Sequence, residues 1–132
     1  MLFDTDVLIW LEKGSRAAAE AVNREDERRV SILTCMELLQ GALDKQHQGA
    51  VHSFLKEMDF IVLPLSANIG TRALIYLEEY SPTSGLRAAD AIIAATAVEN
   101  GIPLLTGDAK HFRAIKELQL KIFKPGKLQN TS

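Results

Sequence analysis

Short apolar runs alternate with segments of helical spacing along almost the whole chain, and this alternation most limits the possible folds. The predicted strands are residues 1–3, 29–33, 60–65, 103–106 and 121–123, and the apolar strand at 60–65 is expected to be buried. The predicted helices are residues 7–14, 15–25, 34–45, 50–58, 66–80, 86–100 and 109–118. Strands separated by helices usually pair in parallel, and the helices cover both faces of the sheet. We therefore predict an α/β fold with a five-stranded parallel sheet and helices on both faces.

The overall composition is that of an ordinary globular protein. The chain has 132 residues, of which 47% are hydrophobic and 24% are charged, enough for a single domain over residues 1–132 with its own core. No apolar run reaches the ~20 residues of a membrane span, and no basic lead precedes a cleavable apolar segment, so we expect neither a membrane anchor nor a secretory signal. The single Cys35 forms no internal disulfide and favours a cytoplasmic location.

The net charge of −2 hides an uneven distribution of charge. From Ala109 onward there are six Lys and Arg residues against the single acidic Glu117, and we expect a basic, frayed tail from about residue 125. Such a segment can contact phosphate groups. A solvated surface that only keeps the protein soluble explains it equally well, and both interpretations stay open.

Acidic residues follow three of the predicted strands. Asp4 and Asp6 come after the first strand, Glu37 after the second, and Asp108 after the fourth. Ligands of open parallel sheets bind beyond the carboxyl ends of the strands. A right-handed crossover brings the first turns of the helix that carries Asp90 to the same end. We therefore expect these carboxylates to meet on one rim of the sheet.

Four of these acidic residues also have purely structural explanations. Asp4 and Asp108 are good N-cap residues for the helices that follow them. Asp6 suits the dipole of the first helical turn. Glu37 fits a capping box in which Thr34 is the N-cap. Considered one at a time, these residues leave the structural and functional interpretations open.

Asp90 is harder to explain by structure alone. Its helix is apolar on nearly every face, and an unpaired buried carboxylate costs several kcal/mol. An ion pair with Arg87, three residues earlier, is one solution, and a metal ion is the other. Crowded carboxylates need a positive charge to stay ionised, and Mg²⁺ or Mn²⁺ prefers such oxygen ligands. A divalent ion there would support hydrolysis of a phosphodiester, which makes the site a nuclease candidate.

Other catalytic patterns are missing from the sequence. It contains no zinc-ligand spacing, no EF-hand loop and no glycine-rich phosphate loop. His111 lies beside Asp108 in the sequence and could contact a substrate, but we interpret it as a surface residue.

The chain resembles the PIN-domain ribonucleases, in particular the VapC toxins of bacterial and archaeal toxin–antitoxin pairs. The resemblance is carried by LFDTDVLIWL, LTCMELLQG, LRAADAIIAATAVENGIPLLTGDAKHF and KIFKP. It implies a PIN-like three-layer fold. It also implies a metal site and catalytic centre made of Asp4, Glu37, Asp90 and Asp108, accompanied by the hydroxyl of Thr106. Asp6 stands where the family often has asparagine, so metal binding and a bracing role both stay open for it.

The resemblance further implies an Mg²⁺- or Mn²⁺-dependent endoribonuclease that acts on RNA and forms a homodimer. Its inhibitor would be a small VapB-like antitoxin that presses a basic side chain into the acidic pocket. Such a side chain can pair with two carboxylates at once. We expect Arg87, Lys110 and Arg113 to contact the phosphates of the substrate.

Two alternatives compete with this interpretation. In a haloacid-dehalogenase-like phosphatase, Asp4 of the segment FDTDVL would be the nucleophile and Asp6 the acid or base. Phe112, however, stands where that family has an acidic residue. The second alternative is a catalytically silent domain that binds RNA or a protein, and the complete acidic set argues against it.

Overall fold

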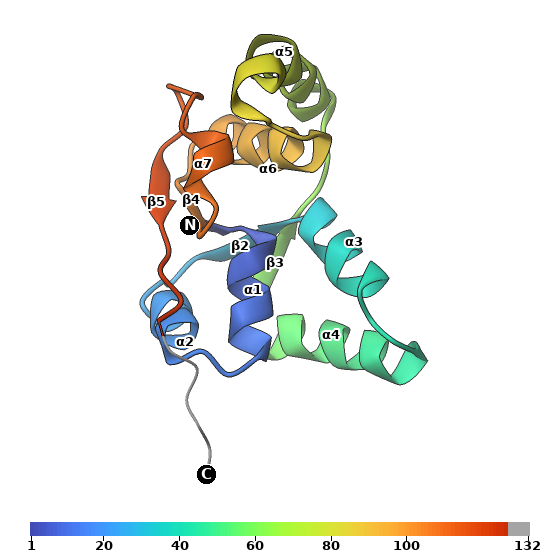
Figure 1. Cartoon of the computed structure of the whole chain (residues 1–132). Helices are drawn as coiled ribbons and strands as arrows, with labels where there is room; N and C mark the ends of the chain where they lie inside the picture. Colours follow the sequence, from blue (N-terminus) through green and yellow to red (C-terminus); the bar gives the residue numbers. More distant parts are fainter. Residues whose placement is uncertain (127–132) are drawn as a thin grey trace.

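The computed structural model of the chain describes residues 1–126 and contains the predicted parallel sheet (Figure 1). Its strands are β1 (Leu2–Phe3), β2 (Arg28–Ser31), β3 (Phe60–Leu63), β4 (Leu104–Thr106) and β5 (Leu120–Ile122). They are hydrogen-bonded in the order β3-β2-β1-β4-β5, and every neighbouring pair is parallel. The predicted fold class is confirmed.

Helices cover both faces of this sheet. They are α1 (Thr5–Glu12), α2 (Arg16–Asn23), α3 (Ile32–Gln40), α4 (Lys45–Glu57), α5 (Ala67–Ser84), α6 (Ala88–Glu99) and α7 (Ala109–Phe112). Leu2 and Leu104 pack into a core with α5, α6 and α7. Their neighbours Phe3 and Leu105 pack into a second core with α1, α2, α3 and α4. Because successive strand residues point to opposite faces, the two cores make three layers (Figure 1).

The ends of several helices follow signals that are visible in the sequence. The Ser15 hydroxyl accepts a hydrogen bond from the Ala18 N–H at 3.2 Å and caps α2. The Ser66 hydroxyl caps α5 in the same way, through the Ile69 N–H at 3.1 Å. Gly101, after α6, has a φ of 63°, a left-handed conformation that suits glycine. These predicted boundaries are confirmed.

The second predicted strand, at 29–33, extends too far. The observed strand β2 ends at Ser31, because the Ser31 hydroxyl accepts a hydrogen bond from the Leu33 N–H at 3.1 Å and caps α3. Ile32 and Leu33 therefore open the helix instead of extending the strand. This shift places Glu37 near the middle of α3, where its side chain reaches the rim of the sheet.

Three other predicted boundaries or environments are wrong. The predicted strand at 60–65 is not buried along its length, because β3 is an edge strand with Ile61 54% exposed and Val62 40% exposed. The predicted loop at 81–85 is helical as far as Ser84, and α5 ends at Gly85 with a φ of 73°. The helix predicted for 109–118 ends at Phe112.

Two further sequence predictions concern the C-terminal tail and membrane-spanning helices. The part of the predicted tail beyond residue 126 lies outside the described residues. Within residues 1–126, no helix is both long enough and apolar enough to cross a membrane.

Candidate active site

Asp4 lies at the carboxyl end of β1 and is the N-cap of α1. Its Oδ1 accepts a hydrogen bond from the Thr5 N–H at 2.8 Å. Its Oδ2 accepts one from the Thr106 hydroxyl at 2.7 Å, at the end of the neighbouring strand β4. The structure thus brings Asp4 and Thr106 together as expected, and Asp4 is only 7% exposed. Capping a helix and lining the rim are compatible roles for this carboxylate.

Glu37 joins the same end of the sheet through Thr5. The Thr5 hydroxyl donates to Glu37 Oε1 at 2.8 Å and lies 3.0 Å from the Thr34 hydroxyl. The predicted capping box is wrong, because Ser31 is the N-cap and Thr34 lies inside the helix. Thr5 therefore holds two carboxylates. Its backbone N–H donates to Asp4, and its hydroxyl donates to Glu37. No local sequence signal points to Thr5 as a site residue, since only the packing of α1 against α3 creates the contact with Glu37.

The paired hydroxyls of Thr5 and Thr34 lead to a stability prediction. Thr5→Val removes one hydroxyl and leaves Thr34, which is fully buried, with one partner fewer. We expect the free energy of unfolding to fall by about 1–3 kcal/mol, the usual cost of an unsatisfied buried polar group. Urea unfolding of the single variants and of Thr5→Val/Thr34→Val measures this. The double variant should lose less than the sum of the single variants, and strict additivity would contradict a direct contact.

Asp6 braces the turn after β4. Its Oδ2 accepts a hydrogen bond from the Gly107 N–H at 2.9 Å. A Cβ at position 107 would lie 2.7 Å from this oxygen, so only glycine allows the close approach. The other oxygen, Oδ1, is buried and has no hydrogen-bond partner in the structure. Asp6 thus has a bracing contact and one oxygen that is free for a ligand.

Asp90 and Asp108 meet at a third side chain, His111. Asp90 Oδ2 accepts a hydrogen bond from the backbone N–H of Arg87 at 3.2 Å, and the ion pair considered for these two residues is not formed in the described part of the chain. The His111 Nδ1 lies 2.7 Å from Asp108 Oδ2 and 4.0 Å from Asp90 Oδ2. His111 is partly exposed, as interpreted from the sequence, but its ring also contacts a carboxylate, which the sequence interpretation did not include. Its position three residues after Asp108, on one helical turn, is the signal that could have found it.

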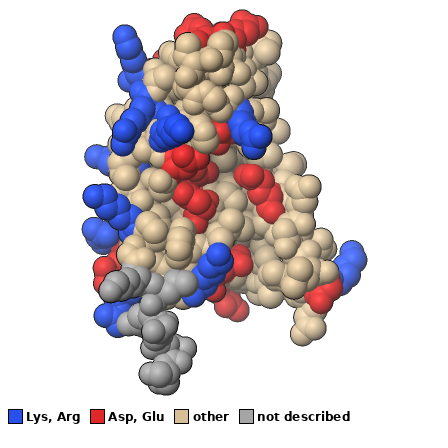
Figure 2. Space-filling model, in the orientation of Figure 1, with Lys and Arg blue, Asp and Glu red and all other residues tan. Residues whose placement is uncertain are grey.

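The carboxylates influence one another electrostatically. Burial raises the pKa of Asp4 to about 7; the hydrogen bond from Thr106 opposes this shift, and the negative charges of Asp6 and Asp90 add to it. Burial also raises the pKa of Asp6, while the Gly107 N–H opposes the shift and the charge of Asp108 adds to it. These couplings place the four aspartates in one neighbourhood. Figure 2 shows Asp and Glu side chains near the middle of one face, with Lys and Arg around them.

The chemistry of these residues fits a hard divalent cation. Every ligand atom that these acidic side chains offer to a metal is an oxygen. One of these oxygens, the buried Oδ1 of Asp6, has no hydrogen-bond partner among residues 1–126. Among residues 1–126, no group of three or more His, Cys, Asp or Glu side chains is placed to hold one ion together. The carboxylates approach one another through Thr5, Thr106, Gly107 and His111 rather than at a common point. Side-chain rotation is therefore needed to complete a metal site.

The three basic residues expected to contact phosphate are all exposed. Arg87 precedes α6, Lys110 lies on α7, and Arg113 follows α7. They thus come from the same two segments as Asp90 and Asp108. Their contact with a substrate stays a prediction.

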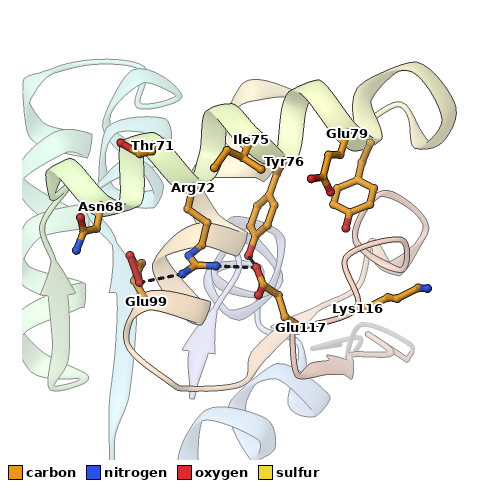
Figure 3. A pocket seen from close by; sticks show the side chains of 10 residues that line it. Asn68, Thr71, Arg72, Ile75, Tyr76, Glu79, Glu99, Lys116 and Glu117 are labelled. Carbon is orange, nitrogen blue, oxygen red and sulfur yellow. Dashed lines mark hydrogen bonds and ion pairs between the residues drawn. The ribbon is translucent and has the colours of Figure 1, made fainter.

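A groove of about 700 Å³ lies away from these carboxylates, along α5 and the segment after α7 (Figure 3). Arg72 joins two of its charged groups by binding Glu117 at 2.7 Å and Glu99 at 3.4 Å. The Nε of Arg72 is buried and has no hydrogen-bond partner among residues 1–126. Tyr76 also donates to Glu117, and burial together with this carboxylate raises the pKa of Tyr76 to about 12. The network ties α5 to α6 and to the segment before β5, which is a structural role.

Comparison with known proteins agrees with the fold. The PIN-domain family model matches residues 1–118, and the chain belongs to the PIN-domain family. Within it, the chain is 33% identical to Ribonuclease VapC1 of Methanocaldococcus jannaschii over 123 residues, which cover 93% of this chain and 86% of that protein. It is thus similar to the VapC ribonucleases of this family.

Solved structures extend the comparison. A toxin–antitoxin complex from Klebsiella pneumoniae contains a chain that is 33% identical, with a TM-score of 0.73, covering 89% of this chain and 93% of that one. VapBC-1 from nontypeable Haemophilus influenzae matches with a TM-score of 0.77 at 24% identity, covering 92% of this chain and 96% of that one. The second match shows the fold alone.

Proposed function

We propose that this protein is a metal-dependent endoribonuclease and the toxin of a VapBC-type toxin–antitoxin pair. The observation that carries the proposal is the meeting of Asp4, Glu37 and Thr106, through direct hydrogen bonds and the shared Thr5, beside Asp90 and Asp108 at the carboxyl end of the sheet. Similarity to proteins named as VapC ribonucleases supports the reaction class.

We assign the roles as follows. Asp4, Glu37 and Asp90 hold the principal Mg²⁺ or Mn²⁺, and Asp108 completes the site directly or through water. When bound, the cation would act as a Lewis acid for hydrolysis of the phosphodiester. Thr106 orients Asp4 by donating its hydroxyl hydrogen to Oδ2.

The remaining assignments concern binding. The exposed Arg87, Lys110 and Arg113 bind backbone phosphates of the RNA. A VapB-like antitoxin inhibits the enzyme by placing a guanidinium or ammonium group among the carboxylates. The active form is a homodimer in the cytoplasm. The complex from Klebsiella pneumoniae, which is 33% identical, supports an antitoxin partner.

Cleavage of RNA by the purified chain tests this proposal. Protein freed of any antitoxin should cut an internally labelled single-stranded RNA when Mg²⁺ or Mn²⁺ is present, and excess EDTA should stop the cleavage. The reaction should return when the metal is added back in excess over the EDTA. The variant Glu57→Gln, which changes an exposed acidic residue on α4, should cut like the parent and serves as the control.

The same experiment separates the alternatives. Metal-independent cleavage would contradict the assigned chemistry. Binding of RNA without cleavage at any metal concentration would favour the catalytically silent domain. Trapping of a phosphoryl group on Asp4 would favour the phosphatase, although both Asp4 oxygens already accept hydrogen bonds in the structure.

A further inference from the structure

Asp108 occupies the N-cap position of α7 but does not cap the helix. An N-cap Asp normally accepts a hydrogen bond from the backbone N–H two or three residues later, which here belong to Lys110 and His111. The Asp108 carboxylate instead bonds to the His111 ring, with Oδ2 and Nδ1 2.7 Å apart. The ring of His111 and the backbone of α7 therefore compete for the same carboxylate.

The ring nitrogen involved can be identified from the chemistry of its partner. An ionised carboxylate only accepts hydrogen bonds, so Nδ1 carries the hydrogen in this contact. The same Nδ1 lies 4.0 Å from Oδ2 of Asp90, which belongs to α6. One ring nitrogen thus faces carboxylates from two different segments of the chain, on the rim where the other acidic residues lie.

The ring of His111 lies near the connection between α5 and α6. Gly85 ends α5 with a φ of 73°. A Cβ built on Gly85 would lie 3.8 Å from Cδ2 and 3.9 Å from Nε2 of His111, which is ordinary contact distance. A methyl group would thus fit between Gly85 and the far edge of the ring, and the side chain is 30% exposed. His111 therefore lies near the α5–α6 connection, and its short contact with Asp108 is what holds the ring.

We propose that His111 is a positioning residue that turns the Asp108 carboxylate away from the cap of α7 and toward Asp90. In this way it sets the spacing of the carboxylates that hold the metal, so the inference rests on the proposed function. Groups that hydrogen-bond to metal ligands commonly change metal affinity by about 10- to 100-fold when removed. Without His111, Asp108 is free to accept a hydrogen bond from its own helix and turns from the rim.

Binding of Mn²⁺ to three variants of the full chain tests the inference. His111→Ala removes the donor, His111→Asn puts an amide nitrogen near the place of Nδ1, and His111→Gln puts one near the place of Nε2. By calorimetric titration, the dissociation constant for Mn²⁺ should rise about 10-fold in His111→Ala and in His111→Gln. His111→Asn should stay within about threefold of the parent, a rescue that a merely space-filling role does not predict. His52→Asn, on the exposed side of α4, is the matched control and should bind like the parent.

A second measurement needs no metal. In His111→Ala, the amide resonance of residue 110 or 111 should shift downfield as Asp108 caps α7, and a crystal structure should show that hydrogen bond. Unchanged Mn²⁺ binding in His111→Ala, equal rescue by Asn and Gln, or an unmoved Asp108 would each overturn the inference. A parent chain that neither binds Mn²⁺ nor cuts RNA contradicts the proposed function itself. A parent chain that does both, together with His111 variants that bind Mn²⁺ equally well, contradicts the positioning role alone.

Discussion

Asp4→Asn is expected to lower the rate of RNA cleavage by about 10³-fold or more while the protein stays folded. The substitution keeps the shape of the side chain but removes the charge that lies closest to Thr106 and the Thr5 amide. A metal ion supplies several kcal/mol of transition-state stabilisation, and each 1.4 kcal/mol corresponds to about a tenfold change in rate. Single-turnover cleavage of a labelled RNA at saturating Mn²⁺ measures the loss.

Asp90→Asn should have an effect of similar size, because this residue also faces the rim and influences the pKa of Asp4. Circular dichroism and urea unfolding show whether both variants are folded, and Glu57→Gln again provides an active control. If either Asn variant kept more than about a tenth of the parental rate, that carboxylate would not be a ligand of the catalytic metal.

Stability of the metal-free protein should fall as the pH rises from about 4 to about 7. Asp4 has a pKa of about 7 in the folded protein, raised by burial from 3.8. The folded state therefore holds a proton that the unfolded state has released between these pH values, so rising pH favours unfolding. The difference corresponds to a loss of about 4 kcal/mol once the pH exceeds 7, and the raised pKa of Asp6 acts in the same direction.

Urea unfolding of the metal-free parent at pH 5 and pH 8 measures this loss. Asp4→Asn has no charge to bury, so its stability should change much less between these pH values, and it should exceed the parent in stability at pH 8. Addition of Mn²⁺ at pH 8 should restore stability to the parent and not to Asp4→Asn. A parent that is more stable at pH 8 than at pH 5 without metal would contradict the burial of a charged Asp4.

The positions of the acidic residues could be predicted from the sequence because they depend on strand order rather than on side-chain detail. Asp4, Glu37 and Asp108 each follow a parallel strand, and all parallel strands end at the same rim. In the structure Asp4 meets Thr106, and Asp90 and Asp108 share a neighbour in His111. Metal binding and catalysis by these residues stay predictions.

The hydrogen bonds that arrange these residues could not be predicted, because they join segments far apart in the sequence. Thr5 and Glu37 are 32 residues apart, and nothing local distinguishes the Thr5 hydroxyl from that of any helix-starting threonine. Glu37 matched a local capping box, but Ser31 caps the helix three residues earlier and removes that role. Local patterns propose several partners for a side chain, and tertiary packing selects one of them.

Two boundary errors have a similar cause. Ile32 and Leu33 suit a strand as well as a helix, and the Ser31 cap decides between the two. The segment SPTSG, which contains Pro82, predicted a loop after residue 80, but a proline removes only one backbone donor. The helix continues two residues beyond Pro82 to Ser84, whose hydroxyl donates to the Tyr80 carbonyl at 2.7 Å. The prediction that β3 is buried was wrong, because sequence patterns do not distinguish an edge strand from a central one.

The contact between Asp4 and Thr106 joins residues that are 102 positions apart in the chain. During synthesis, the first residues leave the ribosome long before β4 does, and β1 has no partner on that side until β4 arrives. If the protein cuts RNA as proposed, a nascent chain therefore lacks the contact between Asp4 and Thr106 until β4 has been made. This order of assembly gives a separately made inhibitor time to be present before the nuclease matures.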